Sequence, residues 1–186
     1  MKSTLFIGAL AAAGIAGGAA FAQDTLQNTI DRGSVLCGVT EGTLGFSARD
    51  SEGKHQGFDV EFCKALAAAI FDDTEAVNYV ELSSANRFTA LSAGQADVLY
   101  RTTTWTFTRD VDLKTNFVGI NYYDGQGFMV PKDLGVTSAK ELDGATVCIE
   151  VGTTTELNLS DYFRVNGMAY QPLNVGGTTE AKAFFE

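Results

Sequence analysis

The alternation of short apolar runs with longer helical segments most constrains what this chain can fold into. Three runs have the length and the apolar character of strands, namely SVLCGVT, VNYVEL and ADVLY. Two helical segments separate them, FDVEFCKALAAAIF and SSANRFTALSAG. Strands that alternate with helices form largely parallel sheets with helices on both faces. The sequence therefore predicts an α/β fold, in which ligands bind at the carboxyl ends of the strands.

Local signals indicate further elements in the first part of the chain. DTLQNTIDRG predicts a short helix closed by Gly33, and the polar stretch ARDSEGKHQG predicts a hairpin or surface loop. In SSANRFTALSAG, we expect Ser83 or Ser84 to cap the helix and Gly94 to end it.

The same rhythm resumes further along the chain. NFVGINYYDGQGFMV predicts a pair of strand-like runs around a DGQG turn. Ser138 is expected to cap a short helix, and ATVCIEV is a buried strand. The segments that follow predict a helix, a strand and a last helix: GTTTELNLSDYF, AYQPLNV and GTTEAKAFFE. Thr153 with Glu156 three positions later is typical of a helix cap.

The first 22 residues differ from the rest and predict a secretory signal peptide. Lys2 precedes a long uncharged stretch rich in Ala and Gly, and Ala20-Phe21-Ala22 places small residues at a cleavage site. A membrane-spanning anchor is the alternative, but no stop-transfer pattern follows. We expect cleavage between Ala22 and Gln23 and therefore a periplasmic location.

An oxidising compartment makes the three cysteines informative. Cys37 lies in a predicted strand and Cys63 on the next predicted helix, so that a disulfide between them is plausible, with two buried free thiols as the alternative. Cys148 is then left without a partner.

Composition and residue counts exclude several classes of function. The 186 residues are 45% hydrophobic and carry a formal charge of −10, which indicates a folded domain that does not bind nucleic acid. The one histidine, His55, lies in a polar turn and is expected to be solvated, so neither a catalytic triad nor a metal site is predicted. The chain contains no Walker or dinucleotide-binding loop, and we expect no cofactor.

Two threonine-rich stretches remain as candidates for ligand binding. If TTTWTFTRD is extended, Thr102, Thr104 and Thr106 point one way, and Arg109 offers a planar fork of donors suited to a carboxylate. In GTTTE, the start of a helix offers free backbone amides next to Thr153. Because both stretches follow strands, we expect them to hold one carboxylate from opposite sides.

Each stretch also has a purely structural explanation. Threonine is common on exposed strands, Arg109 could pair with Asp110 or Asp112, and Thr153 is explained by helix capping alone. It is the occurrence of both stretches together that favours a shared ligand.

At these residues the chain resembles the periplasmic amino-acid-binding proteins of ABC transporters, solute-binding protein family 3, in the general L-amino-acid binding branch. The resemblance covers nearly all of residues 23 to 175. It is carried by RGSVLCGV, QGFDVEFCKALAAAIF, RFTALSAGQADVL, TTTWTFTRD, NYYDGQGFMV and VGTTTELNLSDYF. It implies the type II periplasmic-binding-protein fold, with a hinge between two α/β lobes. We place lobe 1 at residues 23–125 and a partial lobe 2 at residues 126–186.

The resemblance also implies roles for particular residues. Arg109 would clamp the α-carboxylate of a free L-amino acid, polar or acidic ligands being favoured. The residues implied to contact the ligand are Thr102 and Thr104 from lobe 1, Thr153 and Thr154 from lobe 2, and Thr43 and Phe46 from the segment TEGTLGF. The partner would be an ABC permease, and the protein would be a monomer without enzymatic activity.

Two departures from the family pattern stand out. Family members usually have Asn or Ser at the position of Thr102. They are also considerably longer, so the chain is expected to be truncated within lobe 2. The missing part would hold the acidic residue that grips the ligand's ammonium group and a cysteine that pairs with Cys148. An exported dehydratase and the sensing domain of a receptor are the alternative functions.

Overall fold

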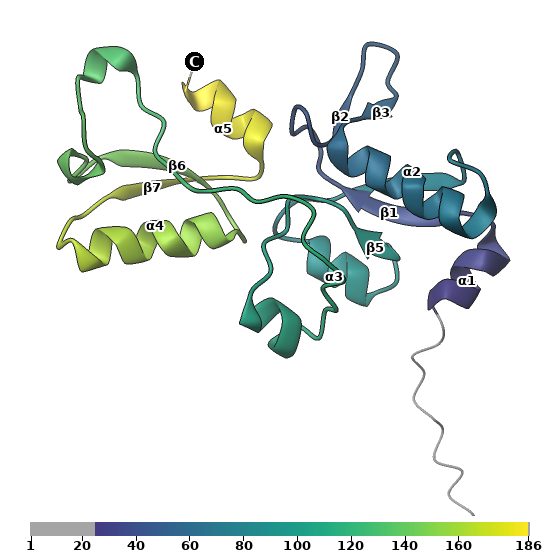
Figure 1. Ribbon diagram of the computed structural model, residues 1–186. Helices are drawn as coiled ribbons and strands as arrows, with labels where there is room; N and C mark the ends of the chain where they lie inside the picture. Colours follow the sequence, from purple (N-terminus) through teal and green to yellow (C-terminus); the bar gives the residue numbers. More distant parts are fainter. Residues whose placement is uncertain (1–24, 186) are drawn as a thin grey trace, which may run out of the picture.

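The computed structural model describes residues 25–185. It consists of two α/β parts joined by a long connecting segment, residues 113–131 (Figure 1). The predicted signal peptide and its cleavage site lie outside the described residues. Within residues 25–185, no helix is both long and apolar enough to cross a membrane.

The first part is built on a three-stranded parallel sheet with the order β4-β1-β5. Its strands are β1 (Val35–Val39), β4 (Val77–Glu81) and β5 (Val98–Leu99), and its helices are α1 (Thr25–Arg32), α2 (Phe58–Phe71) and α3 (Arg87–Ser92). Helices α2 and α3 lie on opposite sides of this sheet (Figure 1). The strand and helix rhythm of the sequence is thereby confirmed.

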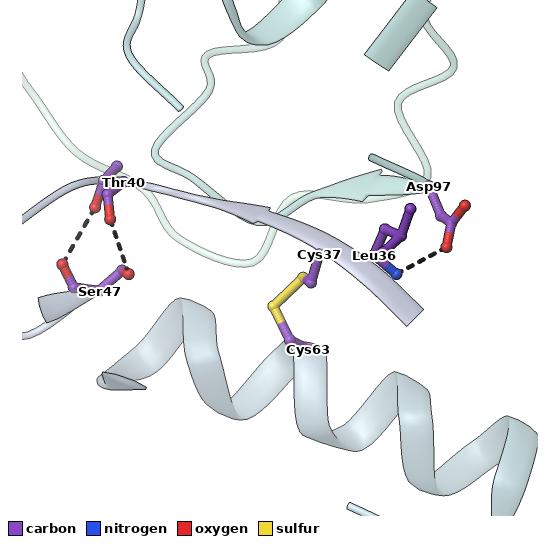
Figure 2. Close-up of a disulfide and its surroundings, with 6 residues drawn as sticks. All are labelled: Leu36, Cys37, Thr40, Ser47, Cys63 and Asp97. Carbon is purple, nitrogen blue, oxygen red and sulfur yellow. Dashed lines mark hydrogen bonds between the residues drawn. A yellow bond between two sulfur atoms is a disulfide. The ribbon is translucent and has the colours of Figure 1, made fainter. Parts of the chain in front are cut away.

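A disulfide between Cys37 on β1 and Cys63 on α2 crosslinks the centre of this part (Figure 2). Both cysteines are fully buried, as are their neighbours Val35, Val39 and Ala67. At the carboxyl end of β1, Thr40 and Ser47 exchange hydroxyl-to-carbonyl hydrogen bonds, which shape the loop that enters the hairpin (Figure 2). The predicted Cys37–Cys63 bridge is confirmed, and Cys148 is a free, half-buried thiol.

The polar stretch after this loop forms the predicted hairpin, from β2 (Ala48–Arg49) and β3 (His55–Gln56). Glu81 on β4 holds it by accepting a hydrogen bond from Arg49 Nε at 2.8 Å and by contacting His55 Nε2 at 3.0 Å. The His55 ring also packs on Tyr79 at 4.5 Å. The expectation of a solvated histidine is wrong, because these contacts leave its side chain only 8% exposed.

The second part contains a two-stranded parallel sheet of β6 (Thr146–Glu150) and β7 (Gln171–Val175), with helices α4 (Thr154–Val165) and α5 (Thr178–Phe185). Leu159 and Phe163 of α4 pack against Ile149 and Leu142 in its core. Before this sheet come two short 3-10 turns, Lys132–Leu134 and Ala139–Glu141. Ser138 caps the second turn by accepting from the Lys140 amide, as predicted.

Two expectations about local structure are wrong. The runs around the DGQG turn are not strands, because no strand in the described part of the chain pairs with them, and Val118 and Tyr123 are 89% and 83% exposed. Helix α3 begins at Arg87 after Asn86 and not after Ser83 or Ser84, although the Ser83 hydroxyl accepts from the Asn86 amide at 3.3 Å in the turn before the helix. Ser84 is buried and its hydroxyl accepts from an arginine, so it does not cap the helix.

Candidate functional site

A cleft of about 560 Å³ lies where the carboxyl ends of the strands of both sheets face one another. The first part contributes residues that follow β1, β4 and β5, and the second contributes residues at the ends of β6 and β7. The lining residues are Thr40–Thr43, Leu82–Ser84, Arg101, Thr102, Glu150, Gly176, Gly177, Thr179, Glu180 and Ala183. The position agrees with the rule that open α/β folds bind ligands at the carboxyl ends of their strands.

The two threonine-rich stretches meet at the junction of the two parts. The hydroxyl oxygens of Thr104 and Thr154 are 3.3 Å apart, which is within hydrogen-bonding distance. The expectation that the stretches approach one another is confirmed. Thr104, Thr154, Thr153 and Arg109 do not line the cleft itself, whereas Thr102 and Thr43 do.

Arg109 lies in the π-helical turn Thr108–Asp112 and is only 7% exposed. Its Nη1 donates to the Thr104 carbonyl at 2.8 Å, and its Cζ lies 5.3 Å from the centre of the Phe88 ring. Burial lowers the pKa of this guanidinium, although an arginine stays charged at neutral pH. Within residues 25–185, Arg109 forms no ion pair with a carboxylate, so part of its donor fork remains for another acceptor.

The nearest acidic residue in the sequence is engaged elsewhere. Asp110 accepts a hydrogen bond from Trp105 Nε1 at 2.9 Å, and the Trp105 ring stacks on Phe117. The alternative in which Arg109 forms an ion pair with Asp110 is therefore wrong. Trp105 packs against the connecting segment.

The predicted common face of Thr102, Thr104 and Thr106 does not form. Thr102 has φ +42°, a left-handed conformation that breaks the extended geometry on which the prediction depended. The Thr106 hydroxyl accepts from the Arg109 amide at 3.3 Å and so supports the turn. Thr102 thus borders the cleft alone among the three.

The second stretch forms a capped helix start, as predicted. The Thr153 hydroxyl accepts from the Glu156 amide at 3.1 Å and donates to the Glu150 carbonyl at 2.7 Å. The Glu156 carboxylate in turn accepts from the Gly152 amide at 2.9 Å. The cap uses the only proton of the Thr153 hydroxyl, and Thr154 is the residue whose hydroxyl reaches the first part.

The remaining predicted residues come from the segment after β1. Thr43 lines the cleft and pairs with Ser47 in an isolated bridge. Phe46 packs edge-on against Phe58 and against Tyr122 of the connecting segment, at 6.0 and 5.0 Å between ring centroids. Phe46 is therefore in an aromatic cluster and not among the residues that line the cleft.

Two buried arginines were missed by the sequence analysis. Arg101 follows β5, lines the cleft and is only 4% exposed, and its two Nη atoms donate to the Ser84 hydroxyl at 3.4 and 3.3 Å. Arg87 is 2% exposed, and its Nη2 donates to the Gly152 carbonyl at 3.2 Å, which connects the two parts. Burial, Arg101 and Arg109 together lower the pKa of Arg87. An arginine directly after a strand that ends at a ligand-binding edge was the available signal for Arg101.

The residues available for a metal are few. In the part of the chain that the structure describes, no group of three His, Cys, Asp or Glu side chains could hold a metal ion.

Comparison with known proteins gives consistent similarities. Residues 35–167 match the model of a family described as bacterial extracellular solute-binding proteins, family 3. The chain is 52% identical over 185 residues to the glutamate/glutamine/aspartate/asparagine-binding protein BztA of Rhodobacter capsulatus, covering 100% of this chain and 54% of that protein. It is 49% identical over 187 residues to the general L-amino acid-binding periplasmic protein AapJ of Rhizobium johnstonii, covering 100% and 55%.

Among solved structures, an ABC transporter periplasmic binding protein from Brucella ovis with glutathione bound is similar to this chain with a TM-score of 0.82. The two are 48% identical, and the alignment covers 87% of this chain and 51% of that one. The predicted fold class, the type II periplasmic-binding-protein fold, is thereby confirmed. The chain spans about half the length of the curated relatives it matches.

Proposed function

Because the chain belongs to family 3 of the bacterial extracellular solute-binding proteins, we propose that it is a receptor that captures a free L-amino acid and delivers it to an ABC permease. In this proposal the protein acts outside the cytoplasm after removal of residues 1–22. Residues 23–125 form lobe 1, and residues 126–186 belong to lobe 2. The place of capture is the junction of the two parts, which includes both the cleft and the meeting of the two threonine-rich stretches.

The observation that carries this proposal is the meeting of Arg109, Thr104 and Thr154. Arg109 is a buried cation without a carboxylate partner in the described residues, and it holds the Thr104 backbone in place. Thr154 reaches Thr104 from the other part of the molecule. A ligand carboxylate that accepts from Arg109 and from both hydroxyls would join the two parts, so binding and closure are coupled.

Polar or acidic amino acids are the favoured ligands. BztA is named for glutamate, glutamine, aspartate and asparagine, and the Brucella ovis protein contains glutathione. The cleft agrees with such ligands, since its lining includes the polar residues Thr43 and Thr102 together with the charged Arg101. Thr43 and Thr102 are proposed to contact the ligand, while Thr153 supports Thr154.

An enzymatic function is not proposed. The relatives reported above are named as binding proteins. Acid–base catalysis most often uses a histidine, and His55 is held by Glu81 and Tyr79 on the hairpin and does not line the cleft.

Calorimetry of the complete protein against a panel of L-amino acids tests this proposal. Arg109→Ala is expected to lower the affinity at least about 100-fold for every ligand, because a charge-assisted two-point contact to the α-carboxylate is lost. The matched control is Arg164→Ala, which removes an exposed arginine that pairs only with Asp161.

The control variant is expected to bind as the wild type does. If Arg109→Ala binds amino acids with unchanged affinity while remaining folded, the assignment of the carboxylate to Arg109 is wrong. If the wild type binds none of the amino acids, the receptor function itself is wrong.

A further inference from the structure

Arg101 is a buried guanidinium whose hydrogen-bonding capacity is largely unused. Its side chain is only 4% exposed, and the hydrogen bonds from Nη1 and Nη2 both go to one hydroxyl, that of Ser84, at 3.4 and 3.3 Å. These bonds are long for charged donors. The Nε atom is buried without any hydrogen-bond partner.

Within the described residues, no neighbouring carboxylate neutralises the charge of the Arg101 guanidinium by direct contact. Burial lowers its pKa, and the more distant charges of Glu150, Asp59 and Glu41 act in the opposite direction. Within residues 25–185, no carboxylate lies close enough to form an ion pair with Arg101. A buried charge in this condition is costly, and an anion that reaches it recovers part of that cost.

The two Nη atoms of Arg101 are on the side of the cleft. Ser84, which holds both Nη atoms, lines the cleft, and so do Arg101 itself and the next residue, Thr102. Arg101 also borders a second cavity between α1, α3 and residues 114–121, but Ser84 does not line that cavity. Its terminal nitrogens are therefore available to a ligand that enters the cleft.

We propose that Arg101 is a specificity-determining residue, which receives a carboxylate on the side chain of the ligand. This inference rests on the proposed function, in which Arg109 takes the α-carboxylate. The protein then prefers ligands with two carboxylates, namely acidic amino acids and short peptides that contain them, over the corresponding amides and over apolar amino acids.

The acidic residues of the cleft are compatible with this preference. Glu41, Glu150 and Glu180 line the cleft, and carboxylates there favour the ammonium group that every amino acid carries. Glu180 already accepts a hydrogen bond from the Gly176 amide at 2.7 Å. A ligand with two carboxylates and one ammonium group matches a cleft that is lined by Arg101 and by several carboxylates, with Arg109 buried after the same strand.

The test compares L-glutamate with L-glutamine by calorimetry on the complete protein, in the wild type and in Arg101→Gln. The wild type is expected to bind glutamate more tightly than glutamine. In Arg101→Gln, the affinity for glutamate is expected to fall roughly 10- to 100-fold, while that for glutamine changes less than about threefold. Arg101→Lys, which keeps the charge and loses the planar fork, is expected to lie between.

The outcomes separate this inference from the proposed function. If amino acids bind but Arg101→Gln weakens glutamate and glutamine equally, or weakens neither, Arg101 does not determine specificity. If Arg101→Gln does not fold, the wild type alone decides, since equal affinity for glutamate and its γ-methyl ester overturns the inference. If no amino acid binds to the wild type, the proposed function fails first.

Discussion

Each of the two threonine-rich stretches has a residue in the left-handed conformation near its start, but the residue type differs. In the second stretch the left-handed residue is Gly152, φ +75°, for which this conformation carries no steric cost. In the first it is Thr102, φ +42°, a β-branched residue for which it is strained. In the second stretch the residue with positive φ is therefore the glycine that this conformation favours, and a helix follows it. In the first stretch a threonine has this conformation, and it lies beside the cleft. Strain of this kind gathers at binding sites, where the surroundings enforce it.

The largest effect is expected from Gly152→Ala. A Cβ at this position would lie 3.1 Å from the Ala85 Cα and from the Ser84 carbonyl oxygen, in addition to the left-handed strain. We expect the free energy of unfolding to fall by about 2–3 kcal/mol in urea denaturation.

The matched control is Gly167→Ala, because Gly167 has φ +65° and no atom within 4 Å of the added Cβ. In this control the free energy of unfolding is expected to fall by about 1 kcal/mol, because only the left-handed strain is added. If the two variants lose the same free energy of unfolding, the close approach of the added Cβ at Gly152 is not destabilising.

A smaller effect of opposite sign is expected from Thr102→Gly. Glycine relieves the left-handed strain, which costs about 1–2 kcal/mol, but loses more entropy on folding. The free energy of unfolding is expected to rise by about 0.5–1 kcal/mol, while the affinity for amino acids falls because the hydroxyl is lost. A loss of stability would mean that the conformation of Thr102 is not strained.

The smallest effect concerns pH and the buried charges beside the first stretch. Burial raises the pKa of Asp59 above 3.8, and the backbone of Thr102 and the charge of Arg101 reduce this shift only in part. A raised pKa in the folded state means that the folded protein binds more protons than the unfolded chain. The contribution of Asp59 to stability is therefore present below pH 3.8 and is lost as the pH rises through the folded pKa.

Urea denaturation as a function of pH checks this expectation. The free energy of unfolding of Asp59→Asn, taken relative to the wild type, is expected to increase as the pH rises from 3.8 towards neutrality. Parallel curves for the two proteins would contradict it.

The order of elements was predictable because it depends on local patterns. The helix α2 and the cap at Thr153 depend on local features, and both were found. The positions of Cys37 and Cys63 on a strand and the next helix made their pairing plausible, and only the structure decides between a disulfide and two free thiols. The meeting of Thr104 with Thr154 followed from the topological rule that places strand ends together.

What was missed depends on contacts that are distant in the sequence. The burial of Arg101 against Ser84 and of Arg87 against Gly152 cannot be read from either local pattern. The same holds for His55, whose polar neighbours suggested solvent, whereas Glu81 and Tyr79 cover it. The runs around the DGQG turn have the composition of strands, but a strand also needs a neighbour to pair with.

The stability of the first part differs before and after the Cys37–Cys63 disulfide forms. It closes a loop with a sequence separation of 26, and a crosslink of that length stabilises a protein by about 3 kcal/mol. While its thiols are reduced, the sheet of the first part lacks this contribution and resists unfolding less. The polypeptide is accordingly easier to unfold before oxidation than after it, so a single covalent bond separates a more pliable state of the first part from a more resistant one.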